Sequence, residues 1–193
     1  NSDLEKLVDT SDERIKSRVG INQRHVVSDG EASSDMSTKV AHSLLEKRGI
    51  SAANIDVIII GTVTPDHPTP STAAIVQNNI NAENAWAFDL SAACSGFLYA
   101  LETGAKFIES GQYKTIMVIG VDTMTSILDF EDRETCIIFG DGAGGVILEA
   151  SKSNTGILGS VLKTDGSGAD SLNVLAGGSK YPASPRSEEH TSE

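Results

Sequence analysis

Residues 55–60 read IDVIII, and this short stretch decides the class of fold. Five of its six side chains are apolar and β-branched, and Asp56 is the one polar residue among them. A continuous run of this kind is typical of a strand that is buried on both faces of a parallel sheet. Residues 115–121, TIMVIGV, have the same character. We therefore predict two buried strands of one parallel sheet.

Helical patterns alternate with these strands. Within residues 35–48, apolar side chains recur at helical spacing, and Gly49 follows as a typical C-terminal stop. Further helices are predicted at residues 71–80 and 97–110, and a short strand at residues 85–90. Strands that alternate with helices imply right-handed βαβ crossovers, so we predict a layered α/β fold.

The flanking segments give more local predictions. Residues 3–18 have helical character with a break at residues 10–12. The remaining predictions are strands at residues 21–27, 136–139, 146–148 and 156–163, a glycine turn at residues 140–145 and a glycine-rich loop at residues 165–178. Residues 186–193, RSEEHTSE, are polar and aperiodic, and they are the translation of a common short-read sequencing adapter. We expect this tail to be non-native and leave it out of the fold.

Charge and composition limit the kinds of partner. The formal net charge is −12, from 27 acidic and 15 basic residues, so a nucleic-acid partner is not expected. No apolar stretch approaches the roughly 20 residues that a membrane-spanning helix needs, so we expect a soluble protein with no membrane partner. Cys94 and Cys136 are expected to be reduced thiols in a cytoplasmic protein.

One local cluster departs from the acidic balance. Arg14, Lys16, Arg18 and Arg24 lie within eleven residues, and only Glu13 opposes them nearby. The cluster can be a solvated basic face, or it can be a small site for a phosphorylated ligand. The residues alone leave both interpretations open.

The segment 89–97, DLSAACSGF, contains the candidate nucleophile, Cys94. A strand is predicted to end near Leu90 and a helix to begin around Cys94, with small residues between them. Unpaired N–H groups and the helix dipole at a helix start both favour a thiolate. The alternative is structural, because Cys94 also begins an apolar helical stripe and free cysteine is often buried. That stripe continues through Phe97, Leu98, Leu101, Ala105 and Ile108.

Other candidate motifs are weaker. Residues 140–145 satisfy G-x-G-x-x-G, but a dinucleotide site needs a helix after this motif, and the residues that follow are strand-like. Cys136 lies in an apolar run and is interpreted as core. The four histidines are not spaced with carboxylates or cysteines as a metal-ligand set would be, so no metal site is predicted.

Several segments together resemble the 3-oxoacyl-(acyl-carrier-protein) synthase III family of the thiolase-like superfamily. They are residues 3–13 (DLEKLVDTSDE), 18–21 (RVGI), 91–97 (SAACSGF) and 137–144 (IIFGDGAG). The resemblance implies a layered αβαβα fold made of two similar halves, which works as a homodimer. Residues 1–185 would then be mainly the N-terminal half, with its first strand missing and the C-terminal half absent.

The resemblance also implies a reaction. Cys94 would accept an acyl group from acetyl-CoA or a related primer and release CoA. Malonyl-acyl-carrier-protein would then lose carbon dioxide and attack the thioester, giving a 3-oxoacyl-carrier-protein that initiates fatty-acid synthesis. CoA thioester is the substrate here, and no cofactor is implied. The family's catalytic histidine and asparagine would lie in the absent half, so we expect this chain alone to aggregate and not to condense.

By the same resemblance, Thr10, Arg18 and Arg133 match positions that hold the nucleotide end of CoA. Arg14 stands where the family often has a tryptophan that stacks on the adenine, and a guanidinium can also stack on a base. Two alternatives remain open: a related CoA-dependent condensing enzyme of secondary metabolism that uses another acceptor, and a non-catalytic scaffold that keeps the fold for dimerisation.

Overall fold

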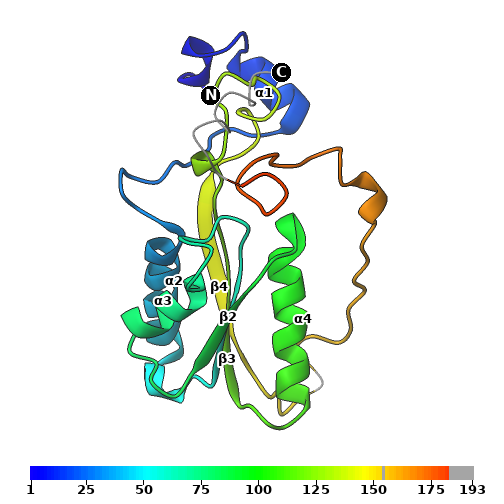
Figure 1. The fold of residues 1–193 in the computed structure, drawn as a ribbon. Coiled ribbons are helices and arrows are strands. Elements are labelled where there is room, and N and C mark those ends of the chain that lie inside the picture. Colours follow the sequence, from blue (N-terminus) through cyan, green and yellow to red (C-terminus); the bar gives the residue numbers. More distant parts are fainter. Residues whose placement is uncertain (154, 183–193) are drawn as a thin grey trace. The chain divides into compact units, whose positions relative to one another are not determined.

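The structure is a computed structural model that describes residues 1–153 and 155–182. The chain divides into two compact units, residues 1–160 and residues 161–193. The first unit contains a layered α/β arrangement (Figure 1). In the described part of the second unit, a short 3-10 turn, η5 (Gly166–Gly168), lies among bends and turns, as the predicted glycine-rich loop implies.

A four-stranded sheet forms the centre of the first unit. Its strands are β1 (Val57–Gly61), β2 (Trp86–Leu90), β3 (Thr115–Thr123) and β4 (Asp141–Glu149), in the spatial order β2-β1-β3-β4. The first three strands are parallel, and β4 runs antiparallel to β3. In the register, Gly61 of β1 lies between Leu90 of β2 and Gly120 of β3, so the carboxyl ends of the parallel strands are level.

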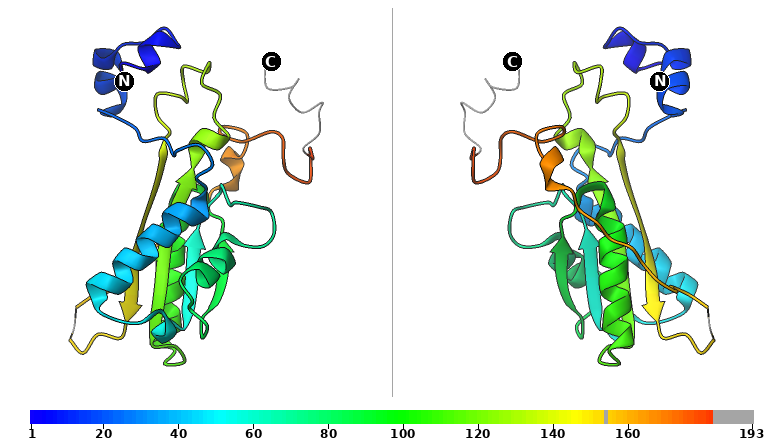
Figure 2. Two further views of the ribbon diagram at one scale, coloured as in Figure 1. Left: turned by 90° about the vertical axis from the view of Figure 1, so that its left-hand side faces the viewer. Right: turned by 90° about the vertical axis from the view of Figure 1, so that its right-hand side faces the viewer.

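Helices cover both faces of the sheet. The helices on the sheet are α2 (Ser33–Arg48), α3 (Thr72–Asn79) and α4 (Gly96–Glu109), and α1 (Asp12–Val19) lies beyond one end of the sheet (Figures 1 and 2). Helices α2 and α3 pack on one face and α4 on the other (Figure 2). The remaining 3-10 turns of this unit are η1 (Leu4–Lys6), η2 (Ala52–Asn54), η3 (Ala93–Ser95) and η4 (Met124–Ser126).

Local signals in the sequence explain the helix ends. Helix α3 begins after Ser71, whose hydroxyl accepts a hydrogen bond from the Ala74 N–H, and α1 begins after Ser11 in the same way. Helix α2 ends at Gly49, which has the left-handed conformation (φ +69°) that glycine adopts at little cost.

The two faces of β1 explain why its sequence is continuously apolar. Ile58 and Ile60 face the core beneath α2 and α3, whereas Val57 and Ile59 face the core beneath α4. Every residue of β1 is buried. Removing such a side chain from water contributes about 1.5–3 kcal/mol, so both layers depend on this strand. The predicted α/β class is therefore confirmed, as are the buried strands near residues 55–60 and 115–121.

Three predicted strands are wrong. Residues 21–27 are not paired in a sheet; the His25 carbonyl accepts one bond from the Asp141 N–H, at 2.8 Å. Residues 136–139 form turns, because the apolar Cys136 and Ile137 pack with Leu4 and Ile15 near α1 and not in the sheet. Within residues 156–163 the structure has bends and coil, with no strand.

The predicted glycine turn at residues 140–145 is also wrong, because Asp141–Glu149 is one continuous strand. Close packing explains one of these glycines, Gly145. A Cβ at Gly145 would lie 2.7 Å from the Val118 carbonyl oxygen and 3.2 Å from Leu44 Cδ1, so only glycine fits between β3 and α2. The G-x-G-x-x-G pattern thus opens a strand and no helix. The predicted non-native tail, residues 186–193, lies outside the described residues.

Candidate active site

Cys94 lies on the η3 turn that connects β2 to α4, at the carboxyl ends of the three parallel strands. In sheets of this kind, ligands bind at that edge, because connecting loops and helix starts converge there. The Cys94 side chain is exposed and free of any disulfide. The strand-to-helix connection predicted from the sequence is therefore confirmed, and α4 begins at Gly96, one residue before the predicted helix at 97–110.

The backbone of this turn is unusual. Ala93 has φ +46°, a left-handed conformation that is uncommon for a residue with a side chain and that costs of the order of 1 kcal/mol. The Ser95 N–H donates to the Ala92 carbonyl at 3.1 Å, and the Gly96 N–H donates to the Ala93 carbonyl. Within the described part of the chain, no hydrogen bond takes the N–H of Cys94. The turn thus presents a thiol together with an available backbone donor.

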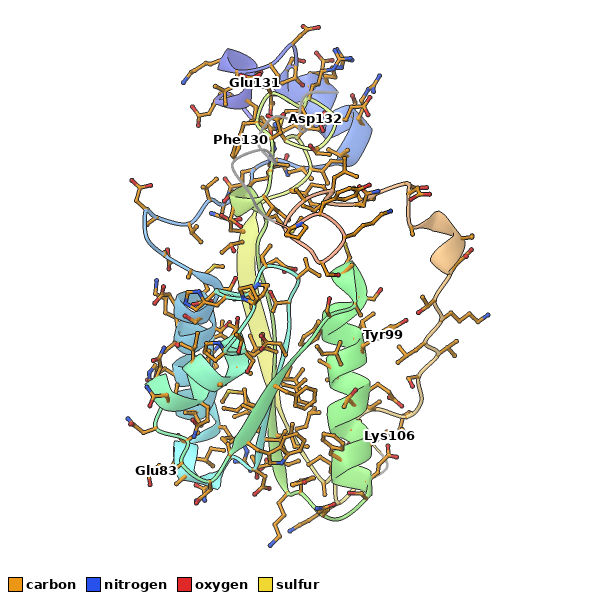
Figure 3. The ribbon with its side chains drawn as sticks, viewed as in Figure 1. Glu83, Tyr99, Lys106, Phe130, Glu131 and Asp132 are labelled. Carbon is orange, nitrogen blue, oxygen red and sulfur yellow. The ribbon has the colours of Figure 1, made fainter. Side chains whose placement is uncertain are left out.

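The alternative interpretation, a buried helical stripe that begins at Cys94, is wrong for Cys94 itself, although Phe97, Ala105 and Ile108 of that stripe pack in the core or are buried. Cys94 is exposed and Leu98 is 56% exposed. The buried residues of α4 are all small: Gly96, Ala100, Gly104 and Ala105. A Cβ at Gly104 would lie 2.9 Å from Leu148 Cδ1, so the small residues let the helix approach closely. Tyr99 and Lys106 mark the opposite side of α4 (Figure 3).

A pocket of about 530 Å³ opens beside Cys94. Its walls come from the η3 turn, from the ends of β1 and β3, and from the first half of β4. Glycines make up much of the wall, so a ligand can approach the backbone directly. The lining residues are Gly61, Ala93, Cys94, Phe97, Gly120, Val121, Asp122, Met124, Gly140, Gly142, Gly144 and Gly145.

A second pocket, of about 420 Å³, brings together the four residues predicted to hold CoA: Thr10, Arg14, Arg18 and Arg133. Thr10, Arg14 and Arg18 come from α1 and the residues before it. Arg133 directly follows Phe130, Glu131 and Asp132, and these three residues lie beside α1 (Figure 3). Residues more than one hundred positions apart thus meet at one surface.

The basic side chains near this second pocket differ in whether they form ion pairs. Arg133 forms a long ion pair with Asp9, at 3.4 Å between Nη1 and Oδ2. Arg14 and Arg18 form no ion pair with any described residue. Lys16 instead pairs with Asp12 at 2.7 Å, and Arg24 donates to Asn1. The basic cluster seen in the sequence therefore divides, and only Arg14 and Arg18 line the pocket.

Cys136 has the structural role that the sequence predicts. It is 1% exposed and packs with Leu4, Ile15 and Ile137. Burial raises the pKa of the Cys136 thiol, and the nearby Asp132 carboxylate adds to the effect. A buried thiol held in its neutral form is a poor nucleophile.

Sequence reasoning missed Asp122, Asp141 and Met124. Asp141 Oδ2 accepts from the Val27 N–H (2.8 Å) and Thr125 Oγ1 (2.6 Å), and Oδ1 accepts from the Thr125 N–H (2.9 Å). This holds the segment that follows α1 against the turn that carries Met124. The parallel strand order was the signal that could have identified Asp122 and Met124, because the end of β3 must lie beside the end of β1.

The described residues contain neither a metal site nor a membrane-spanning helix. No group of three or more histidine, cysteine, aspartate or glutamate side chains is arranged to hold a metal ion there. Likewise, no helix in that part of the chain combines the length and the apolar character needed to cross a membrane.

Comparisons with known proteins agree with the fold. Residues 88–166, which include the Cys94 turn, match the family model described as 3-oxoacyl-[acyl-carrier-protein (ACP)] synthase III. The beta-ketoacyl-[acyl-carrier-protein] synthase III of Chlorobaculum tepidum is 58% identical over 187 residues, which is 95% of this chain and 57% of that protein.

Two solved structures of synthase III are also similar. The Thermus thermophilus structure has a TM-score of 0.85 and 37% identity, over 90% of this chain and 54% of that one. The Aquifex aeolicus structure has a TM-score of 0.77 and 45% identity, over 80% of this chain and 50% of that one. The chain spans a little over half the length of the curated relatives that it matches. By sequence and by fold, the chain belongs to the 3-oxoacyl-[acyl-carrier-protein] synthase III family.

Proposed function

We propose that the full-length protein, this chain together with the rest of the length that its relatives have, is a condensing acyltransferase. It moves an acyl group from a CoA primer to Cys94 and then joins it to malonyl-acyl-carrier-protein, as the first condensation of fatty-acid synthesis. The observation that carries this proposal is the exposed Cys94 thiol, on a strained turn beside a pocket of about 530 Å³.

The first half-reaction takes place at Cys94. The Cys94 thiolate attacks the carbonyl carbon of the CoA thioester and forms a new C–S bond. The available N–H of Cys94 donates to the oxyanion that develops on the carbonyl oxygen, where a fixed donor is most effective. The C–S bond to CoA then breaks, and the CoA sulfur takes up the proton that Cys94 lost. The product is an acyl-Cys94 thioester and free CoA.

The nucleotide end of CoA would bind at the second pocket. Arg14 and Arg18 present two guanidinium groups without an ion-pair partner among the described residues, next to Thr10 and Arg133. A guanidinium matches the geometry of phosphate and makes charge-assisted hydrogen bonds to it. CoA is a substrate in this scheme and no cofactor takes part.

The second half-reaction extends beyond this chain. Malonyl-acyl-carrier-protein loses carbon dioxide, and the resulting enolate carbon attacks the acyl-Cys94 carbonyl and displaces the Cys94 thiolate. We place the histidine and asparagine that stabilise the enolate in the remaining length, so that residues 1–193 alone do not condense. The partners of the full-length protein are then an acyl-CoA, malonyl-acyl-carrier-protein and a second copy in a homodimer, and we expect them to meet in the cytoplasm.

The test is transfer of label from acetyl-CoA. Full-length protein is incubated with [¹⁴C]acetyl-CoA, and the labelled peptide is identified. We expect label on the peptide with Cys94, no label in Cys94→Ala, and normal label in Cys136→Ala. Addition of malonyl-acyl-carrier-protein should convert the label to 3-oxoacyl product. A folded, unlabelled wild-type protein would exclude the enzyme and favour a scaffold, and label that transfers only to another acceptor would point to secondary metabolism.

A further inference from the structure

Asp122 fastens the end of β3 to the segment that follows β1. Its Oδ1 accepts three hydrogen bonds: from Thr62 Oγ1 at 3.1 Å, from the Val63 N–H at 2.8 Å and from Thr64 Oγ1 at 3.1 Å. A carboxylate that accepts several bonds from one short segment fixes the position of that segment more firmly than a neutral acceptor would. The ends of β1 and β3 are therefore held to each other by one side chain.

The bonds around Asp122 continue into a buried network. Thr64 Oγ1 also accepts from the Thr123 N–H at 2.8 Å, and Thr62 Oγ1 accepts from the Thr64 N–H at 3.1 Å. Ser33 Oγ, from α2, donates to the Thr64 carbonyl at 2.7 Å. Thr62, Thr64, Thr123 and Ser33 are all buried, so water does not readily replace a lost partner. Loss of the Asp122 carboxylate would leave two buried threonine hydroxyls without their acceptor.

The strand ends that carry this network pack against the residues that follow Cys94. Gly61 precedes Thr62, and a Cβ added to Gly61 would lie 2.7 Å from the Gly96 carbonyl carbon. Gly120 lies two residues before Asp122, and a Cβ there would lie 3.0 Å from Phe97 Cβ. The last residues of β1 and β3 thus support the start of α4, immediately after Cys94. Asp122 itself also lines the pocket beside Cys94.

We propose that Asp122 is a positioning residue for the acylation of Cys94. Its carboxylate keeps the ends of β1 and β3 in register. Gly61 and Gly120, on these two strands, pack against Gly96 and Phe97 and so fix where α4 begins. The position of the Cys94 turn at the carboxyl ends of the strands is therefore fixed, and Cys94 can reach a bound thioester there. The acylation part of this proposal rests on the proposed function, whereas the positioning of the turn does not.

Asp56 provides a matched control. Its Oδ2 accepts from the Lys114 N–H at 2.7 Å and from the Thr115 N–H at 3.0 Å. Asp56 therefore joins the same two strands, β1 and β3, at their opposite ends. Both aspartates are half-buried and each uses one oxygen for these bonds. Both Asp56→Ala and Asp122→Ala remove bonds that join β1 to β3, but only the second loosens the end that supports Cys94.

The experiment compares Asp122→Ala, Asp122→Asn and Asp56→Ala in the full-length protein. We expect Asp122→Ala to slow acylation at saturating acetyl-CoA by about ten-fold to a hundred-fold, the effect of a small misplacement of a reacting group. The half-saturating acetyl-CoA concentration should stay nearly constant, because Asp122 does not line the second pocket. Asp122→Asn should recover most of the rate, since its amide oxygen can accept the same bonds, and Asp56→Ala should keep the wild-type rate.

Hydrogen–deuterium exchange gives a readout that does not depend on the reaction. In Asp122→Ala, residues 91–97 should exchange faster than in wild type, whereas Asp56→Ala should leave their exchange unchanged. If Asp122→Ala does not fold, the double variant Thr62→Val, Thr64→Val removes two of the three bonds and keeps the charge. Equal loss of rate in the Asp56 and Asp122 variants, or unchanged exchange at residues 91–97, would overturn the proposal. Absence of acylation in wild type would count against the proposed function alone.

Discussion

Gly61 and Gly96 meet backbone to backbone. A Cβ built on Gly61 would lie 2.7 Å from the carbonyl carbon of Gly96 and 2.9 Å from its oxygen. The end of β1 therefore touches the first residue of α4, two positions after Cys94. No side chain separates the sheet from the helix at this point. The position of the Cys94 turn therefore depends directly on the position of β1.

A side chain at position 61 should disturb this contact. Gly61→Ala should lower the free energy of unfolding by about 1–3 kcal/mol, because the neighbouring atoms belong to backbone and cannot turn aside. Thermal unfolding of the full-length variant measures the loss. Gly142→Ala is the control for stability, since a Cβ at Gly142 has no neighbour within 4 Å. Equal unfolding temperatures for the two variants would show that the Gly61–Gly96 contact is not tight.

Two serines of α2 should respond in opposite ways to the same change. Ser33 Oγ donates to the Thr64 carbonyl, whereas Ser37 Oγ is buried without a hydrogen-bond partner among the described residues. We expect Ser33→Ala to lower the free energy of unfolding by about 1–2 kcal/mol, and Ser37→Ala to leave it unchanged or raise it by up to about 1 kcal/mol. Urea denaturation of both full-length variants checks this, and a large loss in Ser37→Ala would reveal an unrecognised partner.

The two cysteines should differ in reactivity. Iodoacetamide at mildly alkaline pH should modify Cys94 in the folded full-length protein and leave Cys136 unmodified, because Cys94 is exposed and Cys136 is 1% exposed. Peptide mass spectrometry measures both sites in one sample. After unfolding in urea, both cysteines should react, which shows that the folded structure protects Cys136. Modification of Cys136 before Cys94 in the folded protein would contradict this arrangement.

The buried thiol should also make stability depend on pH. Burial raises the pKa of Cys136 above its unfolded value, which is about 8.5. Its contribution to stability is complete below the unfolded pKa and is lost as the pH rises through the folded pKa, because only the unfolded state ionises easily. Stability measured from pH 7 upwards should therefore fall less steeply in Cys136→Ala than in wild type. Parallel profiles would mean that Cys136 does not contribute.

The arginines of the second pocket should affect binding and not the chemical step. Arg14→Ala and Arg18→Ala should each raise the half-saturating acetyl-CoA concentration by about ten-fold or more, the equivalent of one charge-assisted hydrogen bond. The acylation rate at saturation should stay near that of wild type. Lys16→Ala is the matched control, since Lys16 lies on the same helix and pairs with Asp12. Steady-state kinetics that show the same change in all three variants would indicate a general charge effect.

Sequence patterns that extend over only a few residues determined much of this fold. The β-branched runs at residues 55–60 and 115–121 become the two central strands, because burial on both faces demands continuous apolarity. The helix predicted at residues 35–48 ends at Gly49, which caps its C-terminus. The helix predicted at residues 71–80 begins after Ser71, which caps its N-terminus. The Cys94 connection was also recognisable, since a strand, a run of small residues and a helix follow one another within a few positions.

Only the tertiary structure decided features that depend on distant neighbours. Residues 136–139 have a strand-like composition but form turns, because α1 offers their apolar side chains a closer partner than the sheet does. Residues 141–145 belong to a strand and not to a turn, because they pair with β3, and at Gly145 the packing of β3 and α2 leaves no room for a larger side chain. The exposure of Cys94 could not be read from its helical stripe either, because Phe97 and Ile108 of that stripe pack against the sheet, whereas Cys94 lies on the turn that precedes α4. Composition and spacing are local quantities, whereas the meeting of Arg133 with α1 and of Asp122 with Thr62 is set by the packing of the whole unit.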